Sequence, residues 1–174
     1  MDAAVADTGL RDGASTDTGA SGASGGGGMG AGTGGTGTGG TSVAPTPPGT
    51  DCRSAAYAGH LYWFCDNNRD WDDARSDCLA VGGDLLTVQD AAEQTFIEGE
   101  LGANQWLIGL DQKNASGANA AGTWEWVDGT LVAGGVENWN SGEPDGADCG
   151  AMNSNGTWRD WSCTNGENWI CEVP

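Results

Sequence analysis

The chain has 174 residues, of which 25 are Asp or Glu and 6 are Lys or Arg, so its formal net charge is −19. This excess of negative charge argues against nucleic acids and anionic membrane surfaces as partners. No apolar run is long enough to cross a bilayer, so we expect no transmembrane segment.

Composition divides the chain into two parts. Residues 1–50 are mainly Gly, Ala, Thr, Ser and Asp and include no aromatic residue, so they bury too little apolar surface to offset the entropy lost on ordering. Residues 51–174 hold all nine Trp and all six Cys. We therefore predict a disordered linker at 1–50 and one globular domain with a single core at 51–174.

A short strand and a helix open the predicted domain. The apolar run at 61–64 indicates the strand. A helix follows, because apolar residues recur at helical spacing after an acidic cap and before a pair of glycines. The residues that define this helix are Trp71, Ala74 and Cys78 on one face, Asp70 as N-cap, and Gly82 and Gly83 at the end.

A second strand and a second helix come next. Residues 85–88 form an apolar run that indicates the strand, and Asp90 begins the helix. Glu93 stands three residues after Asp90, as the partner does in a capping box. The expected apolar face carries Phe96, Ile97 and Leu101, and Gly102 ends the helix.

From residue 106 onward the sequence is typical of strands and loops. Two helices followed by several short strands predict an α+β domain. Residues 129–149 have weak periodicity and predict a long loop, and such loops in compact domains often carry function. The expected strands lie at 107–110, 124–126, 149–152, around Trp158, and at 169–171.

The six Cys indicate an oxidising compartment. They include no Cys-x-x-Cys pair and predict three disulfides. We therefore expect an extracellular or cell-surface location. Because the first residues lack the basic start and apolar core of a signal peptide, we expect the export signal to lie outside this chain. A zinc site at Cys52, His60 and Cys65 is disfavoured by its spacing and its missing fourth ligand, and we expect His60 to be exposed.

The domain resembles a C-type lectin-like domain from Cys52 to Cys171. The resemblance implies the long form of that fold, with two helices, antiparallel sheets and a long irregular loop region. It also implies the disulfides Cys52–Cys65, Cys78–Cys171 and Cys149–Cys163. The motifs that carry it stand at 71–78 (WDDARSDC), 82–85 (GGDL), 106–110 (WLIGL), 122–129 (GTWEWVDG), 143–145 (EPD), 158–160 (WRD) and 170–172 (ICE).

The resemblance implies a calcium ion as the surface that binds sugar. Calcium takes 6–8 oxygen ligands, and two vicinal sugar hydroxyls can supply two of them. The implied metal ligands are Glu143 and Asp145, on either side of a proline that is cis in the family, and Asp160, through its carboxylate and its backbone carbonyl.

Two positions depart from the family pattern. Arg159 stands where the family has an Asn that binds both calcium and sugar, and Ala147 stands where sugar-binding members have an acid. Asp148 is a candidate replacement ligand. Arg159 either pairs with Glu143 or Asp145 in place of the ion or points outward. We favour retained calcium because three acids and one base leave negative charge to neutralise; the alternative is a solvated acidic loop.

Trp161 directly follows Asp160, at a position that often borders the sugar in the family. Its indole either packs against a sugar ring or fills core space. Four other tryptophans lie within the structural motifs and are expected in the core: Trp124, Trp126, Trp158 and Trp169.

These residues predict an extracellular carbohydrate-binding module that uses calcium. Glu143 and Asp145 match neither the mannose-type nor the galactose-type motif, so the sugar is not specified. The alternative function is a calcium-independent protein-interaction module on the same fold. An enzyme is disfavoured, because the chain has one His and no convincing Ser-His-Asp arrangement.

Overall fold

The computed structural model describes residues 45–112 and 123–174. The predicted linker at 1–50 therefore lies outside the described residues except for its last six positions. Pro48 and Gly49 are partly buried, and a β-carbon added to Gly49 would come within 3.2 Å of side-chain atoms of both Asn67 and Trp169. The chain thus already contacts the domain just before residue 51.

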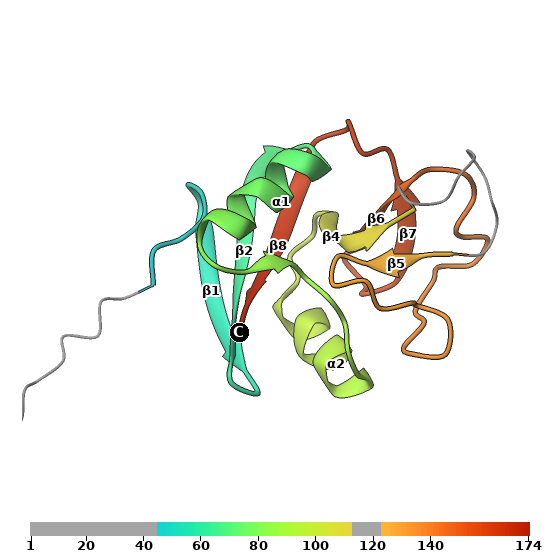
Figure 1. Cartoon of the computed structure of the whole chain (residues 1–174), viewed down its shortest axis with the longest axis horizontal. Helices are drawn as coiled ribbons and strands as arrows, with labels where there is room; N and C mark the ends of the chain where they lie inside the picture. The colour runs from blue at the N-terminus through green and yellow to red at the C-terminus, as the bar shows by residue number, and fades with distance from the viewer. Residues whose placement is uncertain (1–44, 113–122) are drawn as a thin grey trace, which may run out of the picture. The chain divides into compact units, whose positions relative to one another are not determined.

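Two helices and eight strands form the described part of the chain (Figure 1). This composition confirms the predicted α+β class. No helix among the described residues is long and apolar enough to cross a membrane. The elements, in chain order, are β1 (Cys52–Tyr57), β2 (His60–Arg69), α1 (Trp71–Ala80), β3 (Asp84–Leu85), α2 (Ala91–Glu100), β4 (Trp106–Asp111), β5 (Glu125–Trp126), β6 (Cys149–Met152), β7 (Trp158–Trp161) and β8 (Glu167–Val173).

The strands are linked by hydrogen bonds in the order β1-β2-β8-β4-β6-β7, with β3 beside β8 and β5 beside β4. Only the β4–β8 pair is parallel among these described strands. Figure 1 shows α1 lying over β2 and β8, while β5, β6 and β7 lie on the other side of β4. Strand β4 therefore connects the helix-covered part of the sheet to the part that carries the long loop.

The tryptophans expected in the core are buried. Trp158 and Trp169 have no exposed surface, and Trp124 and Trp126 are almost fully covered. The indole nitrogen of Trp158 donates to the side-chain oxygen of Gln94 at 2.9 Å, which ties β7 to α2. These four predictions are confirmed.

The predicted cap of the first helix is confirmed. Asp70 Oδ1 accepts a hydrogen bond from the backbone N–H of Asp73 at 2.9 Å. The helix ends at Ala80, and Gly82 follows with a φ of 85°, a conformation that glycine adopts without strain. Both ends of α1 are therefore determined by residues next to it in sequence.

The second helix begins as predicted, but Glu93 plays a different role. Asp90 Oδ1 accepts from the N–H groups of Ala92 and Glu93 at 2.8 Å. The Glu93 carboxylate accepts from the N–H of Gln89 at 2.7 Å and from the buried Tyr62 hydroxyl at 2.6 Å. The capping-box prediction is thus half confirmed: Asp90 accepts from the N–H of Glu93, but the Glu93 carboxylate accepts from the N–H of Gln89 rather than from that of Asp90.

The first three strands differ from the sequence predictions. Strand β1 was not predicted, since Ser54 and Ala56 are exposed and the strand depends on its pairing with β2. Strand β2 extends well beyond 61–64. The strand expected at 85–88 is shorter, although Leu86 is buried and donates its N–H to the carbonyl of Ile170 at 2.9 Å.

The three disulfides follow the predicted pairing. Cys52–Cys65 joins β1 to β2, Cys78–Cys171 joins α1 to β8, and Cys149–Cys163 joins β6 to the segment after β7. The first bond excludes the zinc alternative. His60 is not freely exposed as expected: its ring pairs with the Glu172 carboxylate, and its side chain is only 33% accessible.

Candidate metal centre

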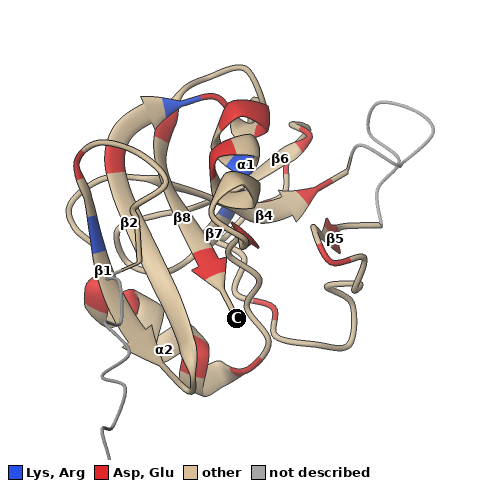
Figure 2. Cartoon of the chain, turned by 60° about the vertical axis from the view of Figure 1, so that its left-hand side comes forward, with Lys and Arg blue, Asp and Glu red and all other residues tan. Residues whose placement is uncertain are grey.

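Three carboxylates converge at one end of the domain. Glu143 and Asp145 come from the loop before β6, and Asp160 comes from β7. One carboxylate oxygen from each lies within 4.8 Å of the other two. The Glu143–Pro144 peptide bond is cis, as the resemblance implies. Acidic residues occur on many elements of the domain (Figure 2), but Glu143, Asp145 and Asp160 are the acids that form such a group among the described residues.

Asp160 holds the loop in place through backbone donors. Its carboxylate accepts from the N–H of Asp145 at 3.1 Å, from that of Gly146 at 2.6 Å, and from that of Ala147. We call residues 145–147 the anchored turn. Burial alone would raise the pKa of Asp160, but the hydrogen bond with Glu143 and the three backbone donors bring it below its ordinary value. Asp160 is therefore ionised and available as a ligand.

Glu143 is the least satisfied acid of the group. Its Oε2 atom is buried and has no hydrogen-bond partner among the described residues. Its pKa is raised to about 7, first because protonated Glu143 hydrogen-bonds to Asp160, and then because of burial and the charge of Asp160. When Glu143 is ionised, this oxygen needs a positive partner. The donor set fits a hard cation such as calcium, which prefers carboxylate oxygens.

Arg159 contacts Trp161 and the backbone carbonyl of Asp160, which the resemblance implies as a calcium ligand. Its guanidinium carbon lies 4.8 Å from the centroid of the Trp161 ring, and its Nε donates to the backbone carbonyl of Asp160 at 3.3 Å. Within residues 45–112 and 123–174, Arg159 forms no ion pair with Glu143 or Asp145. Arg159 is thus not paired with the two acids, but its charge still opposes the rise in the pKa of Glu143, so the choice between the two alternatives stays a prediction.

The remaining predicted site residues lie at the edge of the group. Asp148 is exposed and is not part of the three-carboxylate group. Its backbone carbonyl accepts from the N–H of Gln112 at 2.8 Å, which ties the loop to the end of β4. Trp161 is partly buried beneath Arg159. The ligand roles of Asp148 and Trp161 stay predictions.

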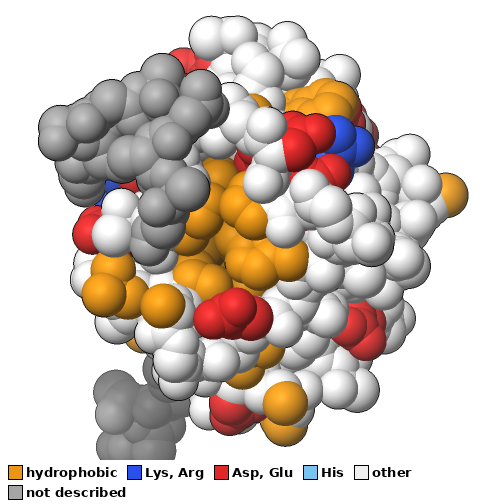
Figure 3. All heavy atoms as spheres, turned by 90° about the vertical axis from the view of Figure 1, so that its right-hand side faces the viewer, with side chains coloured by type: hydrophobic (Ala, Val, Ile, Leu, Met, Phe, Trp, Pro, Cys, Tyr) orange, Lys and Arg blue, Asp and Glu red, His pale blue; other side chains and the backbone are white. Residues whose placement is uncertain are grey.

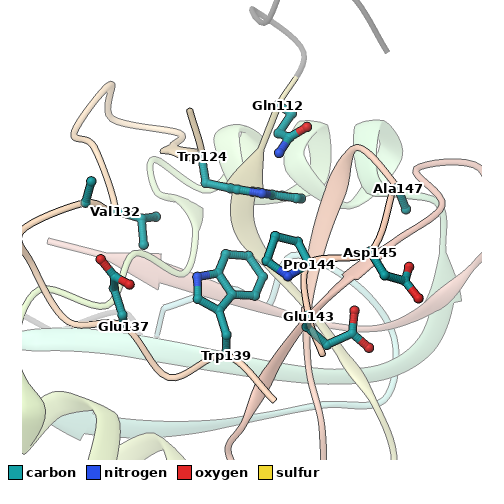
Figure 4. A pocket seen from close by; sticks show the side chains of 11 residues that line it. Gln112, Trp124, Val132, Glu137, Trp139, Glu143, Pro144, Asp145 and Ala147 are labelled. Atoms are coloured by element: carbon teal, nitrogen blue, oxygen red, sulfur yellow. The ribbon is translucent and has the colours of Figure 1, made fainter. Parts of the chain in front are cut away.

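A pocket of about 750 Å³ lies beside the three carboxylates. We call it the tryptophan pocket; Figure 3 shows apolar side chains gathered in a hollow, with acids at its border. In Figure 4, the Trp124 and Trp139 indoles lie next to Pro144, whereas the carboxylates of Glu143 and Asp145 point to the other side of Pro144. The lining of the tryptophan pocket includes Gln112, Trp124, Val132, Glu137, Trp139 and Pro144.

Trp139 is the residue of this pocket that the sequence prediction missed. Its ring centroid lies 5.0 Å from that of Trp124 and 5.8 Å from that of Trp158. The neighbouring backbone is held as well, since Asn140 N–H donates to the Trp158 carbonyl and Trp158 N–H donates to the Asn138 carbonyl, both at 2.7 Å. A lone Trp in a weakly apolar loop was the available signal, because so large an apolar side chain needs a packing partner.

Sequence comparison identifies relatives for most of the domain. The lectin C-type domain family matches residues 67–173, more than half of the chain. Asialoglycoprotein receptor 1 of Rattus norvegicus is 33% identical over 126 residues, which cover 67% of this chain and 42% of the receptor. CD209 antigen of Symphalangus syndactylus is 33% identical over 121 residues, covering 67% and 31% respectively. The chain thus matches less than half the length of either relative.

Solved structures share the same fold. The carbohydrate-recognition domain of the mouse scavenger receptor C-type lectin has a TM-score of 0.62 and 28% identity, covering 68% of this chain and 91% of that one. The C-type lectin domain of murine dendritic cell inhibitory receptor 2, solved in complex with N-glycan, has a TM-score of 0.60 and 26% identity, covering 72% and 97%. A calcium-independent type II antifreeze protein has a TM-score of 0.59 at 24% identity, covering 75% and 93%. Because the family match, the disulfide pattern and the fold all agree, this chain belongs to the C-type lectin family, a family of carbohydrate-binding domains.

Proposed function

We propose that this domain binds carbohydrate through a calcium ion held by Glu143, Asp145 and Asp160. The observation that carries the proposal is the buried Oε2 atom of Glu143, which has no hydrogen-bond partner among the described residues, in a side chain that belongs to the three-carboxylate group. An ionised group in that position is costly unless a cation neutralises it. The N-glycan bound to the related murine domain supports a sugar as the ligand.

Different residues of the chain would have different roles in binding. Glu143, Asp145 and Asp160 would supply negatively charged oxygens to the ion, and the bound calcium would offer open coordination positions to two sugar hydroxyls. Asp160 would also keep the anchored turn in place through its three backbone hydrogen bonds. Trp161 follows Asp160 directly and is proposed to border the sugar, with Arg159 lying over its ring.

A calcium-independent protein-interaction module is the second candidate. It is favoured by the closeness of the Glu143 and Asp160 carboxyl groups, because a proton on Glu143 can be shared by the pair without an ion. That proton is retained only below a pH of about 7, the raised pKa of Glu143. Above that pH the group gains a negative charge, so neutral to alkaline conditions favour the cation and the carbohydrate function.

Calcium titration by calorimetry tests the proposal directly. The wild-type domain should bind calcium, and Glu143→Gln and Asp160→Asn should each weaken binding at least about tenfold, because calcium affinity depends on the number of charged ligands. Asp73→Asn is the matched control, since it removes one exposed negative charge at α1. Asp148→Asn reports whether Asp148 is a further ligand.

A glycan array, probed with calcium and then with a chelator, tests the sugar. Calcium-dependent glycan binding is expected. Absence of calcium binding, together with chelator-insensitive contacts to proteins, would favour the second candidate instead.

The proposed setting is extracellular or at a cell surface, and the proposed activity is binding rather than catalysis. Three disulfides support an oxidising compartment. The rat relative is a receptor by name, which is compatible with a surface location. Residues 1–50 are proposed to act as a linker that holds the domain away from its attachment point.

A further inference from the structure

The tryptophan pocket borders the metal centre, on the other side of Pro144 from the carboxylates. Glu143 and Asp145 belong to both, and Pro144 stands between their carboxylates and the indoles. Its volume of about 750 Å³ falls within the range of roughly 300–1,000 Å³ typical of pockets for organic ligands. This space exceeds what an ion and its water ligands need, so it suits a further chemical group of the ligand.

One wall of the pocket is apolar and partly accessible. Trp139 and Pro144 keep exposed surface, whereas Trp124 is only 6% exposed and forms the back of the wall. The flat face of an indole packs well against the apolar C–H face of a sugar ring. The wall therefore offers a stacking surface for a sugar residue.

The lining of the pocket also includes polar groups. The Gln112 amide can donate and accept, and the exposed Glu137 carboxylate can accept hydrogen bonds. Figure 4 shows Glu137 on the side of Trp139 away from Glu143 and Asp145. This combination of an apolar wall with polar groups beside it suits a sugar ring, which has both C–H and hydroxyl groups.

Charge narrows the class of sugar. The described residues that line the pocket include three acids and no Lys, Arg or His. The carboxylate of Glu137 would repel a uronic acid, a sialic acid or a sulfate placed next to it. A neutral sugar carries no such penalty.

We propose that the tryptophan pocket binds the second residue of a neutral glycan whose first residue is held at the metal centre. This inference rests on the proposed function, because the ion anchors the first residue. The ligand class is accordingly a neutral disaccharide or longer glycan. Trp139 and Pro144 contact the second ring, and Gln112 and Glu137 bind its hydroxyls.

The test compares single sugars with disaccharides in the presence of calcium. The probes are methyl α-mannoside against α-mannobiose, and methyl β-galactoside against lactose, titrated by calorimetry into the full chain. In the pair that binds, the disaccharide should bind about 3- to 10-fold more tightly, the gain expected from one aromatic stacking contact. A disaccharide with a carboxylate on its second residue should lose that gain, and Glu137→Gln should restore part of it.

Ala133→Trp is the informative variant. Ala133 is exposed and lines the pocket, so an indole at this position fills the space without disturbing the core. The variant should lower the affinity for the disaccharide to that for the single sugar and leave the single-sugar affinity unchanged. Ala80→Trp, at the exposed end of α1, is the matched control and should change neither affinity.

The outcomes separate the two proposals. Single-sugar binding with no preference for the disaccharide, or a preference that Ala133→Trp leaves intact, overturns the pocket proposal and leaves the calcium-dependent function standing. Failure of both single sugars and disaccharides to bind in calcium overturns the proposed function, and the pocket proposal with it.

Discussion

Two regions of the domain are held in place by different forces. Strands β1, β2 and β8 with the two helices are held by continuous ladders, two disulfides and buried apolar side chains. The loop at 129–148, between β5 and β6, is held by turns, by backbone bonds to Trp158, and by the Asp160 carboxylate. Changes in the first region should therefore alter stability, and changes in the second should alter ligand binding.

The largest expected effect is the loss of the disulfide between α1 and β8. Cys78 and Cys171 are 93 positions apart, so replacing both with Ala should lower the free energy of unfolding by about 4–5 kcal/mol, because the unfolded chain regains that loop entropy. Replacing Cys149 and Cys163, 14 positions apart, should cost about 3 kcal/mol. Denaturant titration without calcium measures both.

The two disulfide variants should rank in the opposite order when calcium affinity is measured instead of stability. The Cys149–Cys163 bond joins β6 to the segment just after Asp160, so its loss should weaken calcium binding more than the loss of Cys78–Cys171. Equal losses of calcium affinity in the two variants would show that the regions are not separable.

The next effect concerns the buried carboxylate of α2. Glu93→Ala should lower the free energy of unfolding by about 2–3 kcal/mol, because the Tyr62 hydroxyl and the Gln89 N–H both lose their acceptor. Glu100→Ala is the control on the same helix: its exposed ion pair with Arg53 should contribute less than about 1 kcal/mol. Neither variant should change calcium affinity, and a drop in calcium affinity for Glu93→Ala would contradict the comparison.

A pH dependence should appear in the loop region. Calcium needs ionised Glu143, whose pKa is raised to about 7, so calcium affinity should fall about tenfold per pH unit below that value. Calorimetry in two buffers of different ionisation enthalpy should detect one released proton. Without calcium the sign is opposite: because the folded pKa exceeds the ordinary 4.5, protonated Glu143 stabilises the fold. That contribution is complete below pH 4.5 and is lost as the pH rises through about 7. A pH-independent affinity would remove Glu143 from the ligand set.

The smallest effect is expected for Arg159→Asn. Because the guanidinium already lies over Trp161, its replacement should raise calcium affinity less than about tenfold, through the lost positive charge and one new ligand oxygen. Arg69→Asn, which removes a charge paired with Asp77, controls for the long-range part of this effect. A wild-type domain that does not bind calcium, next to an Arg159→Asn variant that does, would show that Arg159 blocks the site.

Features determined by neighbouring residues could be predicted from the sequence. Asp70 and Asp90 cap their helices as expected, because a cap depends on residues two or three positions away. The three disulfides required the family resemblance, since six Cys alone permit 15 pairings. Strand β1 was missed because Ser54 and Ala56 have no strand pattern of their own and extend only through pairing with β2.

The candidate site was only partly predictable. The motif around Pro144 and the motif that ends at Asp160 predicted that the three acids form one site. In the structure, one carboxylate oxygen from each acid lies within 4.8 Å of the other two. The direction of Arg159 depends on the position of Trp161, and the tryptophan pocket depends on packing between Trp139 and Trp124. Such contacts arise from tertiary structure, so a pattern within one segment does not reveal them.

The anchored turn has a consequence for engineering and for evolution. The Asp160 carboxylate accepts hydrogen bonds from the main-chain N–H groups of residues 145–147, and every amino acid except proline has such a group. Ala147 can therefore be randomised in a library to any residue except proline while the turn keeps its shape, whereas Gly146, whose φ is 139°, has to stay glycine. New specificities would then arise on a constant backbone that Asp160 and Gly146 maintain.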